Sequence, residues 1–295
     1  MKIGIAGTGK MGTAIAGRLQ SLGHEVFVWN RTAAKADAAI KAGATWVATP
    51  KALLSQSDTV ICLLTNEQAL DDVYGAPTGL LAAPAPGKLI IEMSTVSPDK
   101  QTEMAKRVAA VGAKYLECPV GGSIGPAKEG KLLGFVGGDA QDLERAKPVL
   151  EQLCRRIEHI GGYGAGSMMK LAINLPLMVY WQTLAEALSL IEPLGIDPKR
   201  AIDIFADSSG GNNLLKNRGP LIAQTLIDGK TDSVNVPVNT LIKDMQAMCL
   251  HAQTLGRHLP LTELAMAKFQ NSAGAGLGPA DSSEHLVRWL QDGRA

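Results

Sequence analysis

The first half of the chain alternates short apolar runs with segments in which apolar residues recur at helical spacing. The runs that predict strands are Lys2–Ala6, Glu25–Trp29, Thr59–Leu64, Lys88–Glu92, Lys114–Glu117 and Leu133–Val136, with Val47 as a further short candidate. The helical spacing covers Met11–Leu22, Ala33–Ala42 and Lys51–Ser57. Nearly continuous apolar strands between helices are typical of a mainly parallel sheet that is covered on both faces. This half therefore predicts an α/β domain.

The pattern changes after about Ile160, where four glycines at 161, 162, 164 and 166 form a bend. Beyond the bend the apolar residues keep helical spacing, and the pattern predicts no strand. The expected helices are Ser167–Leu194, Pro198–Ala206, Asn213–Leu226, Pro237–Leu255, Pro260–Ala273 and Ser282–Gln291. We expect two domains, residues 1–162 and an all-helical domain over 163–295, joined by the long helix that follows the bend.

A glycine motif follows the first predicted strand and opens the first predicted helix. It reads Gly7-Thr8-Gly9-Lys10-Met11-Gly12. The first glycine allows a tight turn, the second lets the backbone approach a pyrophosphate, and the third permits close packing of helix on strand. The N–H groups of the helix N-terminus favour bound phosphate. In this strand–turn–helix context the motif predicts a dinucleotide-binding domain of the Rossmann type, the alternative being a tight turn without a ligand.

The end of the second predicted strand distinguishes NAD from NADP. NAD enzymes usually place an acidic residue there to hold the ribose 2′-hydroxyl. This chain has Asn30-Arg31-Thr32 instead. Arg31 can pair with a 2′-phosphate in bidentate fashion and Thr32 can donate a hydrogen bond, so the sequence predicts NADP. The alternative is a solvated Arg31, or one that stacks on the adenine without setting the preference.

The composition argues against nucleic acid, membrane and metal as binding partners. Hydrophobic residues make up 46% of the chain, charged residues 19%, and the net charge is +1. Since no basic run is present, we expect neither a nucleic-acid nor a membrane partner. The four cysteines form no CxxC pair and the five histidines show no ligand spacing, so we expect no metal. Reduced thiols fit a cytoplasmic protein.

Four further motifs follow in order along the chain. They are Glu92-Met93-Ser94-Thr95-Val96-Ser97-Pro98, Glu117-Cys118-Pro119-Val120-Gly121-Gly122-Ser123, Gly164-Ala165-Gly166-Ser167-Met168-Met169-Lys170-Leu171-Ala172-Ile173-Asn174, and the pair Lys243-Asp244. With the glycine motif, these make the chain resemble the β-hydroxyacid dehydrogenase family over nearly its whole length. Two departures from the family pattern are Gly121, where serine is common, and Thr65, where proline is frequent.

The resemblance implies a set of roles. Lys170 aligns with the catalytic lysine of the family, and the substrate-binding positions correspond to Gly121, Gly122, Ser123 and Asn174. The cofactor-binding positions implied by the motifs are Gly7, Thr8, Gly9, Lys10, Met11, Gly12, Asn30, Arg31, Thr32, Leu64, Thr95 and Lys243. The pair Gly122-Ser123, with Asn30-Arg31-Thr32, is most similar to the NADPH-dependent glyoxylate and succinic semialdehyde reductases. The family resemblance also implies a homodimer or homotetramer.

The chemistry expected from these residues is reversible hydride transfer to a small aldehyde or ketone that carries a carboxylate. An ordinary lysine has a pKa of about 10.4, so Lys170 is already a proton donor in the direction of reduction. Lys170 and Asn174 lie at i and i+4 on one helix face. The alternatives are a solvated Lys170, an Asn174 that is a core spacer, and a surface pair at Lys243. Imine reduction and a non-catalytic NADP-binding sensor or scaffold remain competing functions.

Overall fold

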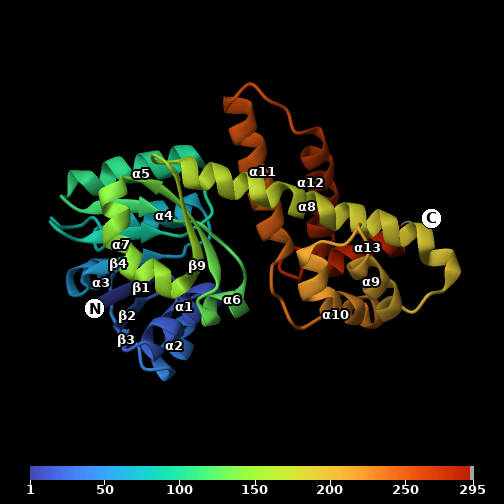
Figure 1. Ribbon diagram of the computed structural model, residues 1–295, viewed down its shortest axis with the longest axis horizontal. Coiled ribbons are helices and arrows are strands. Elements are labelled where there is room, and N and C mark those ends of the chain that lie inside the picture. The colour runs from blue at the N-terminus through green and yellow to red at the C-terminus, as the bar shows by residue number, and fades with distance from the viewer. Residues whose placement is uncertain (293–295) are drawn as a thin grey trace. The chain divides into compact units, whose positions relative to one another are not determined.

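The first structural unit is built around a twisted sheet, as the computed structural model of residues 1–292 shows (Figure 1). The strands are β1 (Lys2–Ala6), β2 (Glu25–Trp29), β3 (Thr45–Trp46), β4 (Thr59–Cys62), β5 (Leu89–Glu92), β6 (Lys114–Glu117), β7 (Val120–Gly121), β8 (Leu132–Gly138) and β9 (Cys154–Gly161). Their order is β3-β2-β1-β4-β5-β6-β8-β7, with β9 paired to β8. Neighbouring strands from β3 through β6 are all parallel.

The parallel part of the sheet places the ends of its strands on one edge. In register, Ala6 of β1 lies beside Cys62 of β4, Cys62 beside Glu92 of β5, and Glu92 beside Glu117 of β6. Because β1 is flanked by β2 on one side and β4 on the other, the connections leave β1 and β4 in opposite directions. In open α/β sheets, ligands bind outside the carboxyl ends of the strands at such a switch point.

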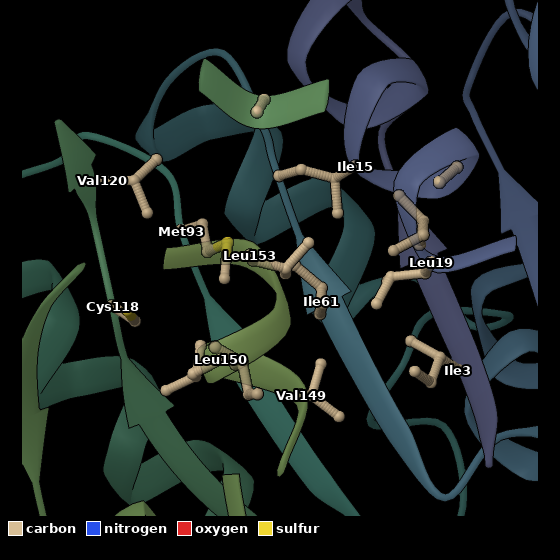
Figure 2. Close-up of a cluster of buried hydrophobic side chains, with 14 of the residues drawn as sticks. Ile3, Ile15, Leu19, Ile61, Met93, Cys118, Val120, Val149, Leu150 and Leu153 are labelled. Carbon is tan, nitrogen blue, oxygen red and sulfur yellow. The ribbon is translucent and has the colours of Figure 1, made fainter. Parts of the chain in front are cut away.

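Helices cover both faces of this sheet. They are α1 (Lys10–Ser21), α2 (Asp37–Lys41), α3 (Pro50–Gln56), α4 (Glu67–Gly75), α5 (Pro98–Ala110), α6 (Ile124–Glu129) and α7 (Ala140–Leu153). Alternate strand residues point to opposite faces, which divides the core into two clusters. One contains Ile3 and Ile61 with Leu19 of α1 and Leu150 of α7 (Figure 2). The other contains side chains of α3, α4 and α5 packed on residues such as Val60.

The second unit, which begins at Ala172, is helical in the part that the structure describes. Its elements are most of α8 (Ala165–Ile191), then α9 (Pro198–Asp207), α10 (Asn213–Asp228), α11 (Val238–Thr254), α12 (Pro260–Ser272) and α13 (Ser283–Asp292). Buried side chains of α10, α11, α12 and α13 include Leu215, Met245, Phe269 and Leu286. Among these residues the only strand-like pairing is an isolated bridge between Pro237 and Asp281.

The predicted fold class is confirmed: a mainly parallel Rossmann-type domain precedes an all-helical region, and long helix α8 joins the two. Residues 293–295 of the second predicted domain lie outside the described part. The apolar pattern alone does not predict α4, α5, α6, α7, β7 or β9. Two predicted elements differ in detail. The segment Ala33–Ala42 is a 3-10 turn followed by α2, and β3 ends at Trp46, one residue before Val47.

A buried ion pair organises the interior of the second unit. The carboxylate of Asp281 accepts two hydrogen bonds from Arg218 Nη2, at 2.7 and 2.9 Å, and one from the backbone N–H of Asn235 at 2.7 Å. Ser283 donates from its backbone N–H and its hydroxyl. Burial by itself would raise the pKa of Asp281, but these N–H donors and the Arg218 charge together lower it below its usual range.

We expect Asp281→Asn to lower the free energy of unfolding by about 3–5 kcal/mol at neutral pH, because Arg218 is left buried without its counter-charge. A lowered carboxyl pKa contributes stability that is present above about pH 4 and is lost as the pH falls through the native pKa. The difference between variant and wild type should therefore shrink in acid. Urea denaturation followed by circular dichroism at neutral and acidic pH measures it.

The matched control is Glu158→Gln, which breaks an exposed pair with Arg156. Exposed pairs contribute about 0–1 kcal/mol, so this variant should unfold almost as the wild type does. Equal stability of the Asp281→Asn and wild-type proteins at neutral pH would show that the buried pair does not stabilise the second unit.

Candidate active site

The glycine loop at the end of β1 has no room for side chains at two of its three glycines. A Cβ on Gly7 would lie 2.3 Å from the Leu63 carbonyl oxygen, and Gly7 has a positive φ of 99°. A Cβ on Gly12 would lie 1.9 Å from the Gly7 carbonyl oxygen. Gly9 is different, since a Cβ there would meet no atom within 4 Å. The loop is therefore tight against the sheet and helix α1 at Gly7 and Gly12, and open at Gly9.

Two further features of this loop fit an anionic group. Helix α1 starts without a side-chain cap on Gly9 and without an acidic residue in its first turn. The hydroxyl of Thr8 is buried and has no hydrogen-bond partner among residues 1–292. An uncapped helix N-terminus attracts phosphate, and a buried hydroxyl needs a partner. The residues of the loop thus fit the pyrophosphate of a dinucleotide.

The segment after β2 presents Asn30, Arg31 and Thr32 in different ways. The Asn30 side chain organises the loops, because Oδ1 accepts from the Thr8 backbone N–H at 3.1 Å and Nδ2 donates to the Thr32 carbonyl at 2.9 Å. Arg31 is exposed, and its Nη1 lies 3.9 Å from Oδ2 of Asp72 on α4. The structure therefore brings Asn30 into the glycine loop and leaves the Arg31 guanidinium accessible at its rim.

The loops after β4 and β5 are tied together by a buried carboxylate. Glu92 ends β5 and accepts from the Tyr74 hydroxyl at 2.7 Å and from the Ser94 backbone N–H at 2.9 Å. The Ser94 hydroxyl in turn accepts from the Leu64 backbone N–H at 2.6 Å. Burial raises the pKa of Glu92 to about 7, against the effect of these hydrogen bonds. Leu64 is thereby held beside Gly7, and Thr95 follows directly after Ser94.

The predicted substrate loop lies just beyond β6. Gly121 ends the short strand β7, and Gly122 has a φ of +124° that favours glycine. Ser123 precedes helix α6, is exposed, and makes no capping hydrogen bond to that helix. A Cβ on Gly121 would be in ordinary contact with Phe135 and Leu133, at 3.4 and 3.5 Å. The chain thus has space for the small side chain that is common at this position in the family.

Helix α8 begins at the same edge of the sheet. Glu117, the last residue of β6, accepts from the Gly166 backbone N–H at 2.9 Å and from the Ser167 hydroxyl at 3.0 Å. Burial raises the pKa of Glu117 to about 7, although the Ser167 and Gly166 donors act to lower it. Lys170 follows one turn later and is half-buried. The acid/base candidate thus belongs to the first unit, on a helix whose start is fixed to β6.

The two predicted site residues of the second unit, Asn174 and Lys243, both contact Asp244. The Asn174 amide donates to Oδ2 of Asp244 at 3.4 Å, and Lys243 Nζ lies 2.9 Å from Oδ1 of the same carboxylate. Asn174 and Asp244 are both buried. Lys243-Asp244 is therefore not an exposed surface pair, since Asp244 is buried. The buried hydrogen bond of Asn174 fits a hydrogen-bonding residue of the core as well as a substrate-binding residue.

No role was assigned from the sequence to four residues of these hydrogen-bond networks, which are Glu92, Ser94, Glu117 and Asp244. All four lie inside motifs that carry the family resemblance, next to residues with assigned roles. Their contacts join segments far apart in the sequence, and Asn174 and Asp244 are separated by 70 positions.

Within the described residues, no group of three or more His, Cys, Asp or Glu side chains could hold a metal ion. Over the same range, no helix combines the length and apolar character needed to span a membrane.

The fold and the glycine loop define a protein that binds a nicotinamide dinucleotide, and comparisons with known proteins agree. Residues 2–161 match the family described as the NAD binding domain of 6-phosphogluconate dehydrogenase. Residues 164–290 match the family described as NAD-binding of NADP-dependent 3-hydroxyisobutyrate dehydrogenase. The chain therefore belongs to the β-hydroxyacid dehydrogenase family, whose members are NAD(P)-dependent oxidoreductases that act on CH–OH groups.

Individual relatives are similar over almost the whole chain. A 3-hydroxyisobutyrate dehydrogenase of Pseudomonas aeruginosa is 32% identical over 275 residues, which cover 92% of each chain. A 2-hydroxy-3-oxopropionate reductase of Escherichia coli is 31% identical over 99% of this chain and 97% of its own. The crystal structure of a 3-hydroxyisobutyrate dehydrogenase from Salmonella typhimurium superposes with a TM-score of 0.88, at 25% identity over 97% of this chain and 99% of that one.

Gly9→Ala tests the fit of the loop to a pyrophosphate. Since a Cβ at Gly9 meets no protein atom and the φ of −66° suits alanine, the variant should fold with an unchanged melting temperature. The methyl group would occupy the space where phosphate approaches the backbone, so we expect NADPH affinity to fall by about tenfold or more. Isothermal titration calorimetry measures the dissociation constant.

Gly17→Ala is the control, because this glycine lies in the middle of α1 and its Cβ also meets nothing within 4 Å. It should bind NADPH as the wild type does. Unaltered binding by Gly9→Ala would place the pyrophosphate elsewhere.

Proposed function

We propose that the protein is an NADPH-dependent reductase that moves a hydride reversibly between the cofactor and a small carboxylate-bearing aldehyde or ketone, with Lys170 as the acid/base. The observation that carries the proposal is the common edge of the sheet. The glycine loop after β1, Leu64 after β4 and the start of α8 beside β6 all lie at the carboxyl ends of neighbouring parallel strands. Lys170 stands one helical turn from that edge.

The residues around the glycine loop supply the cofactor site. Thr8, Gly9, Lys10 and Met11 would hold the pyrophosphate at the start of α1, with Gly7 and Gly12 shaping the loop. Thr95 and Leu64, which lie where the chain leaves β5 and β4, would contact the nicotinamide half of the cofactor. Lys243, in the second unit, is proposed as a cofactor-binding residue on the strength of its motif alone. When bound, the nicotinamide supplies the hydride for reduction or accepts it in oxidation.

The preference for NADPH rests on the segment after β2. The exposed Arg31 guanidinium and the Thr32 hydroxyl would receive the 2′-phosphate, with Asn30 fixing the turn that presents them. The chain has no carboxylate at these three positions to repel that phosphate. The Arg31–Asp72 contact is 3.9 Å long and exposed, so a phosphate dianion can compete for the guanidinium.

Lys170 performs the proton chemistry. As the hydride adds to the carbonyl carbon, negative charge develops on the carbonyl oxygen. The Lys170 ammonium stabilises this charge and gives its proton to the oxygen, which yields the alcohol and a neutral amine. The amine then regains a proton from water. In the reverse direction the neutral amine takes the proton of the hydroxyl group.

The donors proposed for the substrate carboxylate come from two segments, the loop after β6 and helix α8. The Ser123 hydroxyl and the backbone N–H groups of Gly121 and Gly122 lie in the loop after β6. The Asn174 amide lies one turn beyond Lys170 on α8 and is oriented by Asp244. Amide and hydroxyl donors suit a carboxylate or a hydroxyl group, and this favours small hydroxy acids and their oxidised forms as substrates.

Two further properties belong to the proposal. Leucines at 250, 255, 261 and 264, on α11, α12 and the turn between them, are each more than half exposed. Exposed apolar side chains favour a subunit contact, so we propose a homodimer or homotetramer. All four cysteines are buried free thiols, which supports a cytoplasmic location. Residues 1–162 would act as the dinucleotide-binding domain and residues 163–295 as the substrate and subunit-contact domain.

Lys170→Ala removes the proton donor and leaves the glycine loop intact. We expect NADPH oxidation with glyoxylate, succinic semialdehyde or tartronate semialdehyde to fall by at least about 100-fold. The dissociation constant of NADPH should stay within about threefold of the wild-type value, because the pyrophosphate site is unchanged. Loss of NADPH absorbance and a binding titration measure the two quantities.

Lys106→Ala, at an exposed position on α5, controls for the loss of a positive charge. If Lys170→Ala keeps its activity, the lysine is not the acid/base. Turnover by the wild type with a cyclic imine alone would indicate imine reduction. Tight NADPH binding without turnover on any of these substrates would indicate a sensor or scaffold.

Arg31→Ala tests the preference for NADPH over NADH. Loss of a charge-assisted pair with the 2′-phosphate should weaken NADPH by about 10–100-fold and leave NADH nearly unchanged. The ratio of the two dissociation constants is the measurement. Asp72→Asn is the matched variant, since it releases Arg31 from its acidic neighbour and should shift the ratio slightly toward NADPH. Equal weakening of both cofactors by Arg31→Ala would refute the 2′-phosphate assignment.

A further inference from the structure

Glu117 is a residue of strand β6 whose side chain accepts hydrogen bonds from the start of helix α8. The other side-chain caps of the first unit lie directly before their own helices. The Glu117 side chain is fully buried at the end of β6, and both oxygens accept hydrogen bonds from the first turn of α8. The donors, the Gly166 backbone N–H and the Ser167 hydroxyl, lie 49 and 50 positions further along the chain. The start of the helix is thereby attached to a strand rather than to its own loop.

The surroundings of the carboxylate are shaped to admit it. A Cβ on Gly137 of β8 would lie 2.0 Å from Glu117 Oε1, so a side chain there would displace the carboxylate. A Cβ on Gly166 would lie 2.3 Å from the Phe135 carbonyl oxygen. Ser167 is only 1% exposed. Two glycines and a buried hydroxyl thus let the helix N-terminus pack directly against β8 with the Glu117 carboxylate inserted beneath it.

Four other helices of this unit, α3, α4, α5 and α7, begin with a side-chain cap from the residue just before the helix. Thr49, Asn66, Ser97 and Asp139 each accept from a backbone N–H two or three residues ahead in their own helix. Such a cap stabilises the helix but does not determine where the helix stands on the sheet. Capping a helix with a buried carboxylate is less favourable than capping it with a local polar side chain, because burial disfavours the charge of the carboxylate. Because Glu117 belongs to β6, its hydrogen bonds to α8 also fix where that helix starts on the sheet.

We propose that Glu117 is a positioning residue that sets the location of Lys170. By fixing the rotation and depth of the first turn of α8, the carboxylate fixes the side chain that leaves the helix one turn later, because a helix is rigid over that length. The inference rests on the proposed role of Lys170. It assigns to Glu117 no contact with substrate or cofactor.

The test compares Glu117→Ala, Glu117→Gln and Ser167→Ala with the wild type. Alanine removes both hydrogen bonds. Glutamine keeps the shape and one carbonyl acceptor for the Gly166 N–H, and its NH2 group can donate to the Ser167 hydroxyl. Ser167→Ala removes a single hydrogen bond without changing the acid, which keeps the proposal testable if Glu117→Ala does not fold. Thr49→Ala is the control for loss of a helix cap away from the site.

Three quantities are measured for each variant. Hydrogen–deuterium exchange of the segment 163–171 reports the first turn of α8, stopped-flow single turnover reports hydride transfer, and titration reports NADPH affinity. For Glu117→Ala we expect faster exchange in this segment and hydride transfer slower by about 10–100-fold, since small displacements of a catalytic group cost that much. NADPH affinity should change by less than about threefold. Glu117→Gln should restore both exchange and rate to within about threefold of the wild type, and Ser167→Ala should fall between.

Different outcomes separate this proposal from the proposed function. A Glu117→Ala protein with faster exchange but unaltered hydride transfer would overturn the positioning role, as would a loss confined to NADPH affinity. The same holds if Glu117→Gln is as slow as Glu117→Ala, or if Thr49→Ala slows hydride transfer equally. If the wild type reduces none of the substrates, the reductase assignment fails and the positioning of a catalytic lysine fails with it. Exchange then still shows whether Glu117 holds the helix.

Discussion

The site depends on two buried carboxylates at the ends of adjacent parallel strands. Glu92 and Glu117 are register partners on β5 and β6, and each binds a segment that follows the sheet. Glu92 holds Ser94, and through it the segment after β4, whereas Glu117 holds the start of α8. Loops are ordinarily the most mobile part of an α/β domain. Here the segments that carry Leu64, Thr95 and Lys170 are bonded to strand ends, which gives the proposed chemistry a rigid base.

In the second unit, too, buried carboxylates bind residues from separate segments of the chain. The Asp244 carboxylate gathers Asn174 and Lys243, and Asp281 gathers Arg218 with the segment before α11. A buried acid without partners would be strongly unfavourable, so each one demands several donors. Since those donors come from separate elements, a single carboxylate determines how several helices meet. Two of the proposed site residues, Asn174 and Lys243, are thus neighbours of a buried acid.

The fold class was predictable because its signals are local. The motif from Gly7 to Gly12 spans six residues, and an apolar run marks each of the strands β1, β2, β4, β5, β6 and β8. Helix α7 was not predicted, although its buried residues Leu143, Ala146, Leu150 and Leu153 recur at helical spacing. Helix α5 carries a detectable signal, since Ser97 and Pro98 form a cap followed by proline at the first helical position.

The roles of Glu92, Glu117 and Asp244 were not predictable by the same means, because their partners are distant in sequence. A glutamate at the end of an apolar strand has no periodic signature, and only the fold brings Gly166 to Glu117. The resemblance to a family marks the segments that matter but not the contacts inside them. Sequence patterns therefore locate the proposed site residues, and the hydrogen bonds that hold them in place become visible only in the folded chain.

The pair formed by Arg31 and Asp72 has a consequence for how cofactor choice can change over time. Both side chains are largely solvent-accessible, and neither contributes to the core on which the sheet depends. With Arg31 in its proposed role, exchanging either charge would alter the attraction for a 2′-phosphate at almost no cost in stability. Under that proposal, a single surface substitution is enough to change the nucleotide preference, and the buried hydrogen bonds of Glu92 and Glu117 are left unaltered.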